Sequence, residues 1–349
     1  MKRLYLLCLG LAVLTGCKKD EDDPAPSGGG GGPTGGNASI HIVGYDIPSS
    51  YLQACYWKDG VRTNLSDGSS DAVANAIAVT DDHVYVVGYM DFAGSVLNIP
   101  VLWVDGTVQP LATASGPFDA AVGVDVYNGE VHVVGSRRHP VSGNDVATYW
   151  HNGAEQALTD GSSDAVATGV SVDATGVYVS GEMDGKAVYW HDGVQVELTD
   201  GTHSAAATDI EVENGVVYVC GGEENDSGIL QACTWTNGTK STLTLNGGLA
   251  SDLHVVGGDL YVVGRSSITE GDEGFSTYWV NSSSYATANP PNAAFSYSAG
   301  AGIWFDGTKV HTVSGLYGPL SNASGVYSDN TTGTATGGFG KGAADICVH

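Results

Sequence analysis

This sequence is poor in basic residues. It has 13 Lys and Arg against 39 Asp and Glu, which gives a formal net charge of −26 at pH 7. A surface this negative repels the phosphates of nucleic acids and the charges of anionic polysaccharides, so we exclude nucleic acid as a partner. Neutral glycans, cations and basic proteins remain compatible with the charge, and so does the plain solubility of an extracellular protein.

Long helical periods and long apolar runs are also missing. The apolar stretch near the N-terminus, residues 4–13, is too short to span a membrane. Leu is scarce, whereas Val, Tyr, Thr and Gly are abundant, with Gly supplying 51 of the 349 residues. This composition favours short strands joined by tight turns, and it predicts an all-β protein.

A unit of 40 to 51 residues recurs seven times along the chain. In each copy a run of the type Val-Tyr-Val-Val-Gly precedes a short apolar run that ends in an aromatic residue. The glycines are Gly44, Gly88, Gly135, Gly181, Gly221, Gly264 and Gly315. The aromatic residues are Trp57, Trp103, Trp150, Trp190, Trp235, Trp279 and Tyr327. Repeats of this length, filled with short strands, predict a seven-bladed β-propeller with four-stranded antiparallel blades.

The clearest copy of the unit lies between residues 166 and 199. Residues 167–172, 177–181, 187–191 and 194–198 are interpreted as its four strands, which we name A to D from the axis outwards. An Asp-Gly pair joins strands C and D, which is a strong hairpin signal. The same signal recurs in other copies, so we interpret these Asp and Asn residues as turn formers and not as catalytic groups.

The two ends of the repeat region predict how the ring closes. Residues 39–44 match strand B with no strand A before them, and residues 343–349 match the strand A at 206–212. We therefore expect the C-terminal strand to complete the first blade, which is the velcro closure of propellers. The propeller domain is then expected to cover residues 37–349.

The first residues resemble those of a bacterial lipoprotein. Lys2 and Arg3 precede the apolar stretch, and the sequence LTGC at 14–17 resembles a lipobox, in which Cys17 is lipidated and becomes the first mature residue. The resemblance implies a signal peptide at 1–16 and an acyl anchor, such as palmitate, in the outer membrane. An ordinary signal peptide or a short anchor is the alternative.

The next segment gives a more specific location. Residues 18–23 (KKDEDD) resemble the acidic export signal of Bacteroidota surface lipoproteins, which implies a protein on the cell surface that faces the medium. A solvated charge run is the alternative. Residues 24–36 (PAPSGGGGGPTGG) have the composition of a flexible linker, so we expect 17–36 to tether a monomeric head to the membrane.

The repeat resembles kelch-like and related bacterial propellers over residues 37–349, at the level of the fold. The paired glycines of kelch blades are absent, and so is the Ser-x-Asp-x-Gly-x-Thr-Trp box of sialidase propellers. The repeated DGSSDA segment (67–72 and 160–165) lacks the full ligand series of an EF-hand, so we interpret it as a turn between blades. The resemblance therefore assigns no functional residue.

Alignment of the seven A strands predicts a polar cluster on the propeller axis. Alternate positions pack between blades, and the others face the central channel. The channel candidates for ligand binding are Asp209, Glu211, Asp252, His254, Trp304 and Asp345. Crowded carboxylates repel unless a cation joins them or their pKa values rise. We therefore expect calcium or magnesium held by Asp209, Asp252 and Asp345, or else a water-filled polar channel without a ligand.

The two faces of the predicted propeller differ. The A–B and C–D turns on one face are short and alike, whereas the B–C and D–A loops on the other are longer and vary between blades. The longer B–C loops lie at 89–99, 136–145, 222–229, 265–275 and 316–323. Because variable loops on a rigid scaffold usually carry binding sites, the loop face is the expected binding face.

Four cysteines remain once Cys8 leaves with the signal peptide and Cys17 takes lipid, namely Cys55, Cys220, Cys233 and Cys347. An exported protein can form disulfides between such residues. In the hairpin at 177–190 a tight turn pairs Gly181 with Val188, and by alignment Gly221 then faces Cys233 while Cys220 points to the other side. Unless a bulge resets this register, we expect all four to be buried thiols.

No nucleophile–base pair and no metal-enzyme spacing accompanies these residues, which weighs against catalysis. The preferred hypothesis is a non-catalytic module that binds an extracellular glycan or protein. One alternative is a carbohydrate-active enzyme with Asp209, Glu211 and Asp252 as acid and base. The other is a structural subunit of an outer-membrane surface complex.

Overall fold

The computed structural model describes residues 38–91, 97–113, 115–267, 274–286, 297–317, 324–329, 338–339 and 342–349. The predicted signal peptide (1–16) and tether (17–36), with Cys17, lie outside these residues. So do residues 92–96, 268–273 and 318–323 of three predicted loops. Within the described ranges, no helix is long and apolar enough to cross a membrane.

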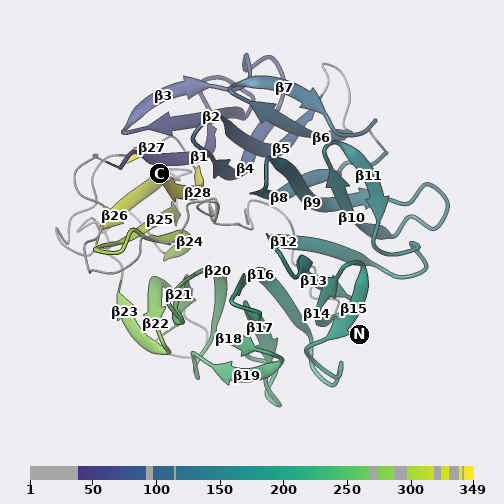
Figure 1. Cartoon of the computed structure of the whole chain (residues 1–349), viewed down its shortest axis with the longest axis vertical. Coiled ribbons are helices and arrows are strands. Elements are labelled where there is room, and N and C mark those ends of the chain that lie inside the picture. Colours follow the sequence, from purple (N-terminus) through teal and green to yellow (C-terminus); the bar gives the residue numbers. More distant parts are fainter. Residues whose placement is uncertain are drawn as a thin grey trace.

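The described strands form seven four-stranded antiparallel sheets, arranged as the blades of a β-propeller around one axis (Figure 1). Blade 1 consists of β28 (Gly342–Val348), β1 (Ile40–Asp46), β2 (Gln53–Lys58) and β3 (Val61–Asn64). Blade 2 consists of β4 (Ala72–Val79), β5 (Val84–Asp91), β6 (Asn98–Val104) and β7 (Thr107–Pro110). Blade 3 consists of β8 (Ala120–Tyr127), β9 (Glu130–Arg138), β10 (Asp145–His151) and β11 (Ala154–Ala157).

The other four blades repeat this order. Blade 4 consists of β12 (Ala165–Asp173), β13 (Gly176–Met183), β14 (Lys186–His191) and β15 (Val194–Glu197). Blade 5 consists of β16 (Ala205–Glu213), β17 (Val216–Glu224), β18 (Leu230–Thr236) and β19 (Thr239–Thr242). Blade 6 consists of β20 (Gly248–Val256), β21 (Asp259–Ser266), β22 (Phe275–Val280) and β23 (Ser283–Ala286). Blade 7 consists of β24 (Tyr297–Phe305), β25 (Val310–Tyr317), β26 (Ser324–Asp329) and β27 (Gly338–Phe339).

The C-terminal strand closes the ring, as the sequence predicts. β28 is the inner strand of blade 1 and pairs antiparallel with β1, with Ile346 opposite Ile42. Beyond the strand, Ser39 and His349 exchange two backbone hydrogen bonds of 2.7 and 3.0 Å. Figure 1 shows the C-terminus beside β1. Two distant parts of the chain thus form one sheet, and no exposed edge is left at the seam.

The predicted Asp-Gly and Asn-Gly turns are present, with both residues in the left-handed region. At the C–D turn of blade 4, Asp192 has a φ of 49° and Gly193 a φ of 78°, which is the pattern of a type I′ hairpin. The Oδ1 atom of Asp192 also accepts a 2.9 Å hydrogen bond from the N–H of Val177. The interpretation of these residues as turn formers is confirmed, because both backbone and side chain are used in the turn.

In blades 2 to 6 the glycine that ends the Val-Tyr-Val-Val-Gly run is needed because the backbone of strand A approaches it closely. A Cβ added at Gly88 would lie 1.9 Å from the carbonyl oxygen of Val73, and one at Gly181 would lie 2.1 Å from that of Val166. Next to these contacts strand A contains an irregularity, between Ala74 and Ala76 in blade 2. Such a bulge bends the strand toward its neighbour, and only glycine leaves room there.

The hydrophobic core lies between successive blades. The aromatic residue at the end of each C strand is buried there, and Trp103, Trp150 and Trp235 are 0 % exposed. The Nε1 atom of Trp103 in blade 2 donates a 3.0 Å hydrogen bond to the carbonyl of Leu65, next to blade 1. Each blade therefore depends on its neighbour for burial of its largest apolar side chain.

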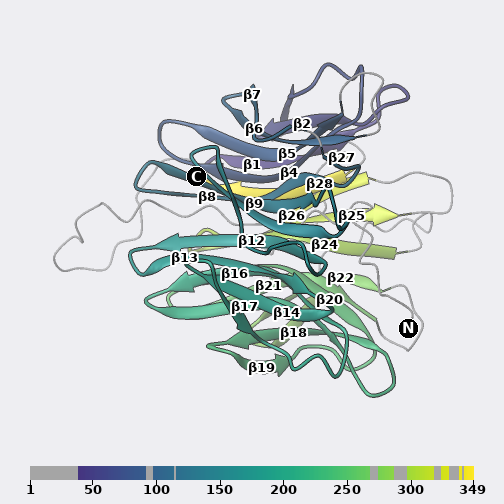
Figure 2. The ribbon, with the colours of Figure 1, turned by 90° about the vertical axis from the view of Figure 1, so that its right-hand side faces the viewer.

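The direction of the strands determines which turns and loops lie at each face of the propeller. In every blade the A–B and C–D turns lie at one face, and the B–C and D–A loops lie at the other. In the side view, blades 1 and 2 and blade 5 lie on opposite sides of the ring (Figure 2). The inner strands β4, β8, β12, β16, β20, β24 and β28 surround the axis (Figure 1).

Candidate functional site

The predicted channel residues lie on the inner strands of neighbouring blades, next to bulges in those strands. Asp209 and Glu211 belong to β16, Asp252 and His254 to β20, Trp304 to β24 and Asp345 to β28. The register of β16 shifts between Ala207 and Asp209, and that of β20 shifts between Ala250 and Asp252. Asp209 and Asp252 therefore each follow directly after a bulged residue, at the point where the inner strand bends.

The three aspartates form contacts between blades. Asp209, Asp252 and Asp345 are each at most 1 % exposed. The Oδ2 atom of Asp209 accepts a hydrogen bond of 3.3 Å from the N–H of Leu253 in the next blade. Oδ2 of Asp252 accepts one of 2.7 Å from Ile303, and Oδ2 of Asp345 accepts one of 2.8 Å from Ile77. One oxygen of each carboxyl group thus joins adjacent inner strands.

In some blades the side chain of the bulged residue donates a hydrogen bond to a backbone carbonyl of the next blade. The hydroxyl of Thr208 donates a 2.9 Å hydrogen bond to the carbonyl of Ala250. Thr168 donates one of 3.1 Å to Ala207, and the amide of Asn75 donates one of 2.9 Å to Ala121. These polar contacts satisfy backbone groups that the bulges remove from the sheet ladder.

A second level of contacts lies two residues further along the inner strands. An oxygen of Glu211 accepts a 2.8 Å hydrogen bond from the N–H of Val255, and Asp125 accepts one of 2.7 Å from Val172. The hydroxyl of Ser171 accepts one of 3.0 Å from Val212. Side chains that alternate along a strand share one face, so the two levels form a ladder of acceptors between blades.

His254 and Trp304 complete this second level. Their rings are stacked with centroids 4.0 Å apart and planes at 18°. The Nδ1 atom of His254 lies 3.4 Å from an oxygen of Glu211. Glu211, His254 and Trp304 therefore connect the inner strands of blades 5, 6 and 7 side by side.

Burial favours the protonated forms of Asp209 and Asp252. It raises the pKa of both carboxyl groups well above the usual value, and the charges of Asp209 and Asp345 raise the pKa of Asp252 further. Neither Oδ1 atom has a hydrogen-bond partner among the described residues. A proton held on either carboxyl group would supply the donor that these buried oxygens lack.

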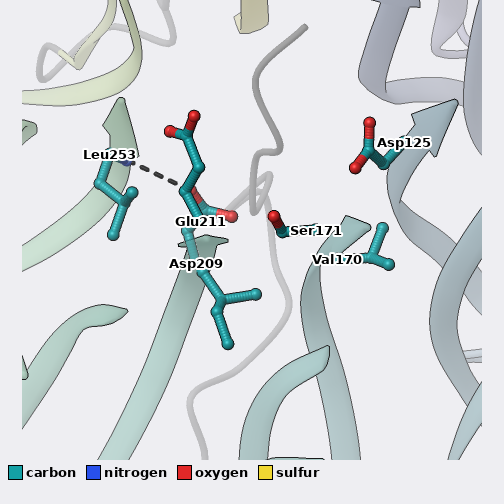
Figure 3. A pocket seen from close by; sticks show the side chains of 7 residues that line it. Asp125, Val170, Ser171, Asp209, Glu211 and Leu253 are labelled. Atoms are coloured by element: carbon teal, nitrogen blue, oxygen red, sulfur yellow. Dashed lines mark hydrogen bonds between the residues drawn. The ribbon is translucent and has the colours of Figure 1, made fainter. Parts of the chain in front are cut away.

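A small pocket opens between blades 3, 4, 5 and 6 at this point. It is lined by Asp125, Val170, Ser171, Asp209, Ile210, Glu211 and Leu253. Figure 3 shows the carboxylates of Asp125 and Glu211 on either side of the Ser171 hydroxyl. Gly169 leaves space beside the carboxyl group of Asp209, because a Cβ at position 169 would lie 2.4 Å from Oδ1 of Asp209. The pocket is polar, but it is too small for a sugar ring.

These contacts limit the chemistry of the predicted site. A glycosidase needs two carboxyl groups that reach the substrate, whereas Asp209 and Asp252 are fully buried and already bonded to backbone N–H groups. This arrangement argues against the enzyme alternative. A calcium or magnesium ion at Asp209, Asp252 and Asp345 stays a prediction, and Glu211, His254 and Trp304 stay candidates for ligand binding at the channel.

The loop face carries most of the exposed large apolar side chains found outside the edge strands. They are Ile47, Tyr51, Phe118, Val141, Leu245 and Phe275. All lie in or beside B–C and D–A loops, and Val256 alone among the described residues lies at an A–B turn. Arg137, near the end of β9, has a structural role, because it is 3.1 Å from the buried carboxylate of Asp119 and also pairs with Glu155.

The repeated DGSSDA segments (67–72 and 160–165), which the sequence analysis compared with a calcium-binding loop, are turns. Oδ1 of Asp67 accepts hydrogen bonds from the N–H and the hydroxyl of Ser69, and Oδ1 of Asp160 accepts one from the N–H of Ser162. Each carboxylate closes a local turn of the kind that Asp favours. The interpretation of these segments as connections between blades is confirmed.

The cysteines follow the predicted register. Gly181 faces Val188 and Gly221 faces Cys233, so Cys220 and Cys233 point to different sides of the hairpin. Cys55, Cys220 and Cys233 are buried thiols. Cys347 is also buried, on the inner strand β28.

One group of polar residues was missed in the sequence. Glu130, His132 and His151 lie together at the turn face of blade 3. A signal was available, because Glu130 and His132 are two residues apart on one strand and so share a face. The Gly135–Thr148 register then places His151 opposite His132.

Comparisons with known families and curated proteins find no match: no protein-family model matches the sequence, and no curated protein matches it. Among solved structures it is similar to TolB from Acinetobacter baumannii, at 14 % identity and a TM-score of 0.47, covering 71 % of this chain and 63 % of TolB. It is also similar to a chain of a nidogen/laminin complex, at 12 % identity and a TM-score of 0.42, covering 88 % of this chain and 98 % of the other. The chain thus spans less than two thirds of the TolB chain, and the propeller assignment rests on its own sheet topology.

Proposed function

We propose that this chain is a surface lipoprotein whose propeller is a non-catalytic module that binds an extracellular protein through its loop face. The observation that carries the proposal is the distribution of exposed apolar side chains. Phe118 is 59 % exposed, Leu245 78 % and Val141 88 %, and all three belong to the variable loops. Aromatic and aliphatic side chains exposed together are typical of protein interfaces.

Protein is a better fit than glycan for this face. A glycan-binding site stacks sugars on aromatic rings. Tyr51, Phe118 and Phe275 offer such rings, but Ile47, Val141 and Leu245 are aliphatic, and Val141 and Leu245 are the most exposed side chains of the set. The excess of acidic residues favours a partner with a basic surface, because opposite potentials speed association and suppress wrong partners. Binding of a glycan is kept as an alternative outcome of the test.

The anchor is part of the same proposal. The lipobox-like sequence with Cys17 supports lipidation, and the acidic residues 18–23 support export to the surface of a Bacteroidota outer membrane. The Gly-rich segment at 24–36 would hold a monomeric head away from the membrane. Loss of acyl labelling in a Cys17→Ala variant, and loss of protease accessibility on intact cells after neutralisation of residues 20–23, test these two steps.

The binding proposal is tested with face-specific variants. The double variant Phe118→Ser and Leu245→Ser removes two apolar side chains from the loop face, and Val256→Ser removes one from the turn face as a matched control. We expect a partner enriched by the wild-type protein to be retained by the control and lost from the double variant. Binding to glycan arrays without any protein partner, or equal capture by all three proteins, would contradict the proposal.

A further inference from the structure

Blade 3 carries a cluster of metal-ligating side chains at the turn face, far from the loops of the proposed binding surface. Each of Glu130, His132 and His151 offers one ligand atom, and these atoms all lie within 4.8 Å of one another. Within the described ranges no other trio of His, Cys, Asp or Glu meets this criterion. Glu130 and His132 come from β9, and His151 ends β10 directly opposite His132.

The ring of His132 is held in place by a buried tyrosine. His132 is buried, and its Nδ1 atom is 2.6 Å from the hydroxyl oxygen of Tyr149. This contact fixes the ring and leaves Nε2 directed away from Tyr149. Histidines that bind metals usually have their second nitrogen fixed by such a polar partner. Glu130 and His151 are half exposed and bonded to each other, so they can move toward an ion.

Two other blades contain the same His–Tyr pair and show what is particular to blade 3. The pairs are His41 with Tyr56 in blade 1, and His311 with Tyr327 in blade 7. In blade 1 the residue opposite the histidine is Lys58. In blade 7 it is Asp329, which pairs with Lys309, and Nε2 of His311 is bonded to Asp306. Lysine excludes a cation from both places, whereas blade 3 has a carboxylate and a second imidazole.

We propose that Glu130, His132 and His151 bind one divalent transition-metal ion, with Zn²⁺ as the representative. Two imidazoles and one carboxylate form a ligand set that suits zinc and its neighbours and not calcium or magnesium. Three protein ligands leave one position of a tetrahedral site open, at the surface of the turn face. Tyr149 supports the site by accepting a hydrogen bond from Nδ1–H of His132 when Nε2 holds the ion.

Binding requires a small rearrangement. The rings of His132 and His151 are stacked with centroids 4.9 Å apart and planes at 15°. Parallel rings do not direct their nitrogen lone pairs at one point, so the His151 ring must turn out of the stack. Its exposure permits this turn, and the contact between His151 and Glu130 is exchanged for two bonds to the ion.

The test is titration of the chelator-treated protein with Zn²⁺ by calorimetry, alongside thermal unfolding. We expect one zinc per chain and a rise of the unfolding midpoint with zinc concentration. His151→Ala should abolish the binding, and Tyr149→Phe should weaken it by about 10- to 100-fold. The matched control is His41→Asn, which removes the histidine of the equivalent pair in blade 1 and should leave zinc binding unchanged.

Because His132 is buried, its replacement alone is a weak test. His151 and Glu130 are exposed, so His151→Ala and Glu130→Gln are expected to fold as the wild type and to decide the question. Absence of saturable zinc binding to the wild-type protein overturns the proposal. So does zinc binding that survives in His151→Ala with unchanged affinity, which would place the ion elsewhere.

Discussion

The carboxyl group of Asp209 in blade 5 accepts the backbone N–H of Leu253, the residue that follows Asp252 in blade 6. Asp252 in turn accepts the backbone N–H of Ile303 in blade 7. Burial of both carboxyl groups raises their pKa values well above the usual value, so this part of the inner wall is most stable when it holds a proton.

The first prediction concerns pH and Asp252. Burial raises the pKa of both carboxyl groups above 3.8, so the folded protein keeps a proton that the unfolded chain releases. The stabilisation by this proton is complete at pH values below the carboxyl pKa of the unfolded chain. It is lost as the pH rises through the raised pKa of the folded protein. Asp252→Asn supplies a permanent N–H donor. We expect the variant to be more stable than wild type at alkaline pH, by about 1–3 kcal/mol.

The measurement is the free energy of unfolding of both proteins across a pH series. Its control is Asp226→Asn, which neutralises a fully exposed carboxylate and should change the pH dependence little. A wild-type protein and an Asp252→Asn variant with parallel pH profiles would contradict the raised pKa of Asp252.

The second prediction concerns the closure of the ring. Deletion of residues 343–349 removes the inner strand of blade 1, including the buried Ile346 and Val348. We expect a loss of at least about 4 kcal/mol, because each such side chain contributes about 1.5–3 kcal/mol on burial. The point variant Asp345→Ala removes the acceptor of the Ile77 and Ile346 N–H groups and should cost about 1–3 kcal/mol.

Both variants are measured by denaturant unfolding. An unchanged unfolding midpoint in the deletion variant would show that blade 1 is stable without its inner strand, which is the opposite of what the pairing of β1 with β28 implies.

The third prediction concerns Gly181. A Cβ at this position would lie 2.1 Å from the carbonyl oxygen of Val166 and 2.7 Å from the ring of Trp190. We expect Gly181→Ala to destabilise the fold by about 3 kcal/mol, because neither neighbour has room to move. Gly193→Ala is the comparison. It has space around it but a φ of +78°, so it should cost only about 1–2 kcal/mol. Chemical denaturation of both variants checks the order, and equal costs would argue against the close approach.

The fourth prediction concerns thiol reactivity. Burial raises the pKa of Cys220 well above its usual value, and burial also raises the pKa of Cys55 and Cys233. Thiolates and not thiols react with alkylating agents, so we expect these three residues to stay unmodified in the folded protein. Mass spectrometry of peptides after alkylation, with and without denaturant, measures each site. Modification of Cys220 at the same rate in both conditions would contradict its burial.

Several features were predictable because they are local. The Asp192-Gly193 turn needs two left-handed residues, and the sequence supplies them at that point. The pairing of Gly181 with Val188 follows from the length of the intervening turn. The role of β28 could be predicted because its alternation of apolar and polar residues matches the other A strands. In all three cases the information lies within one repeat or in its comparison with another.

The candidate site was predictable only in part. Alignment placed Asp209, Asp252 and Asp345 on inner strands, but it gave no sign of the bulges that precede them. A bulge moves one residue out of the ladder and changes which groups the next side chain meets. For this reason alignment did not show that these carboxylates accept N–H groups from the next blade.

The sequence alone determined the all-β class, the seven blades, the closure of the ring and the division into a uniform face and a variable face. These follow from periodicity and turn chemistry, which act between residues close in the chain. Only the tertiary structure decided that Asp209 and Asp252 are buried acceptors of N–H groups from the next blade and that Glu130, His132 and His151 gather at one surface. Those properties depend on distances between separate strands, and burial and charge act through space whatever the separation along the chain.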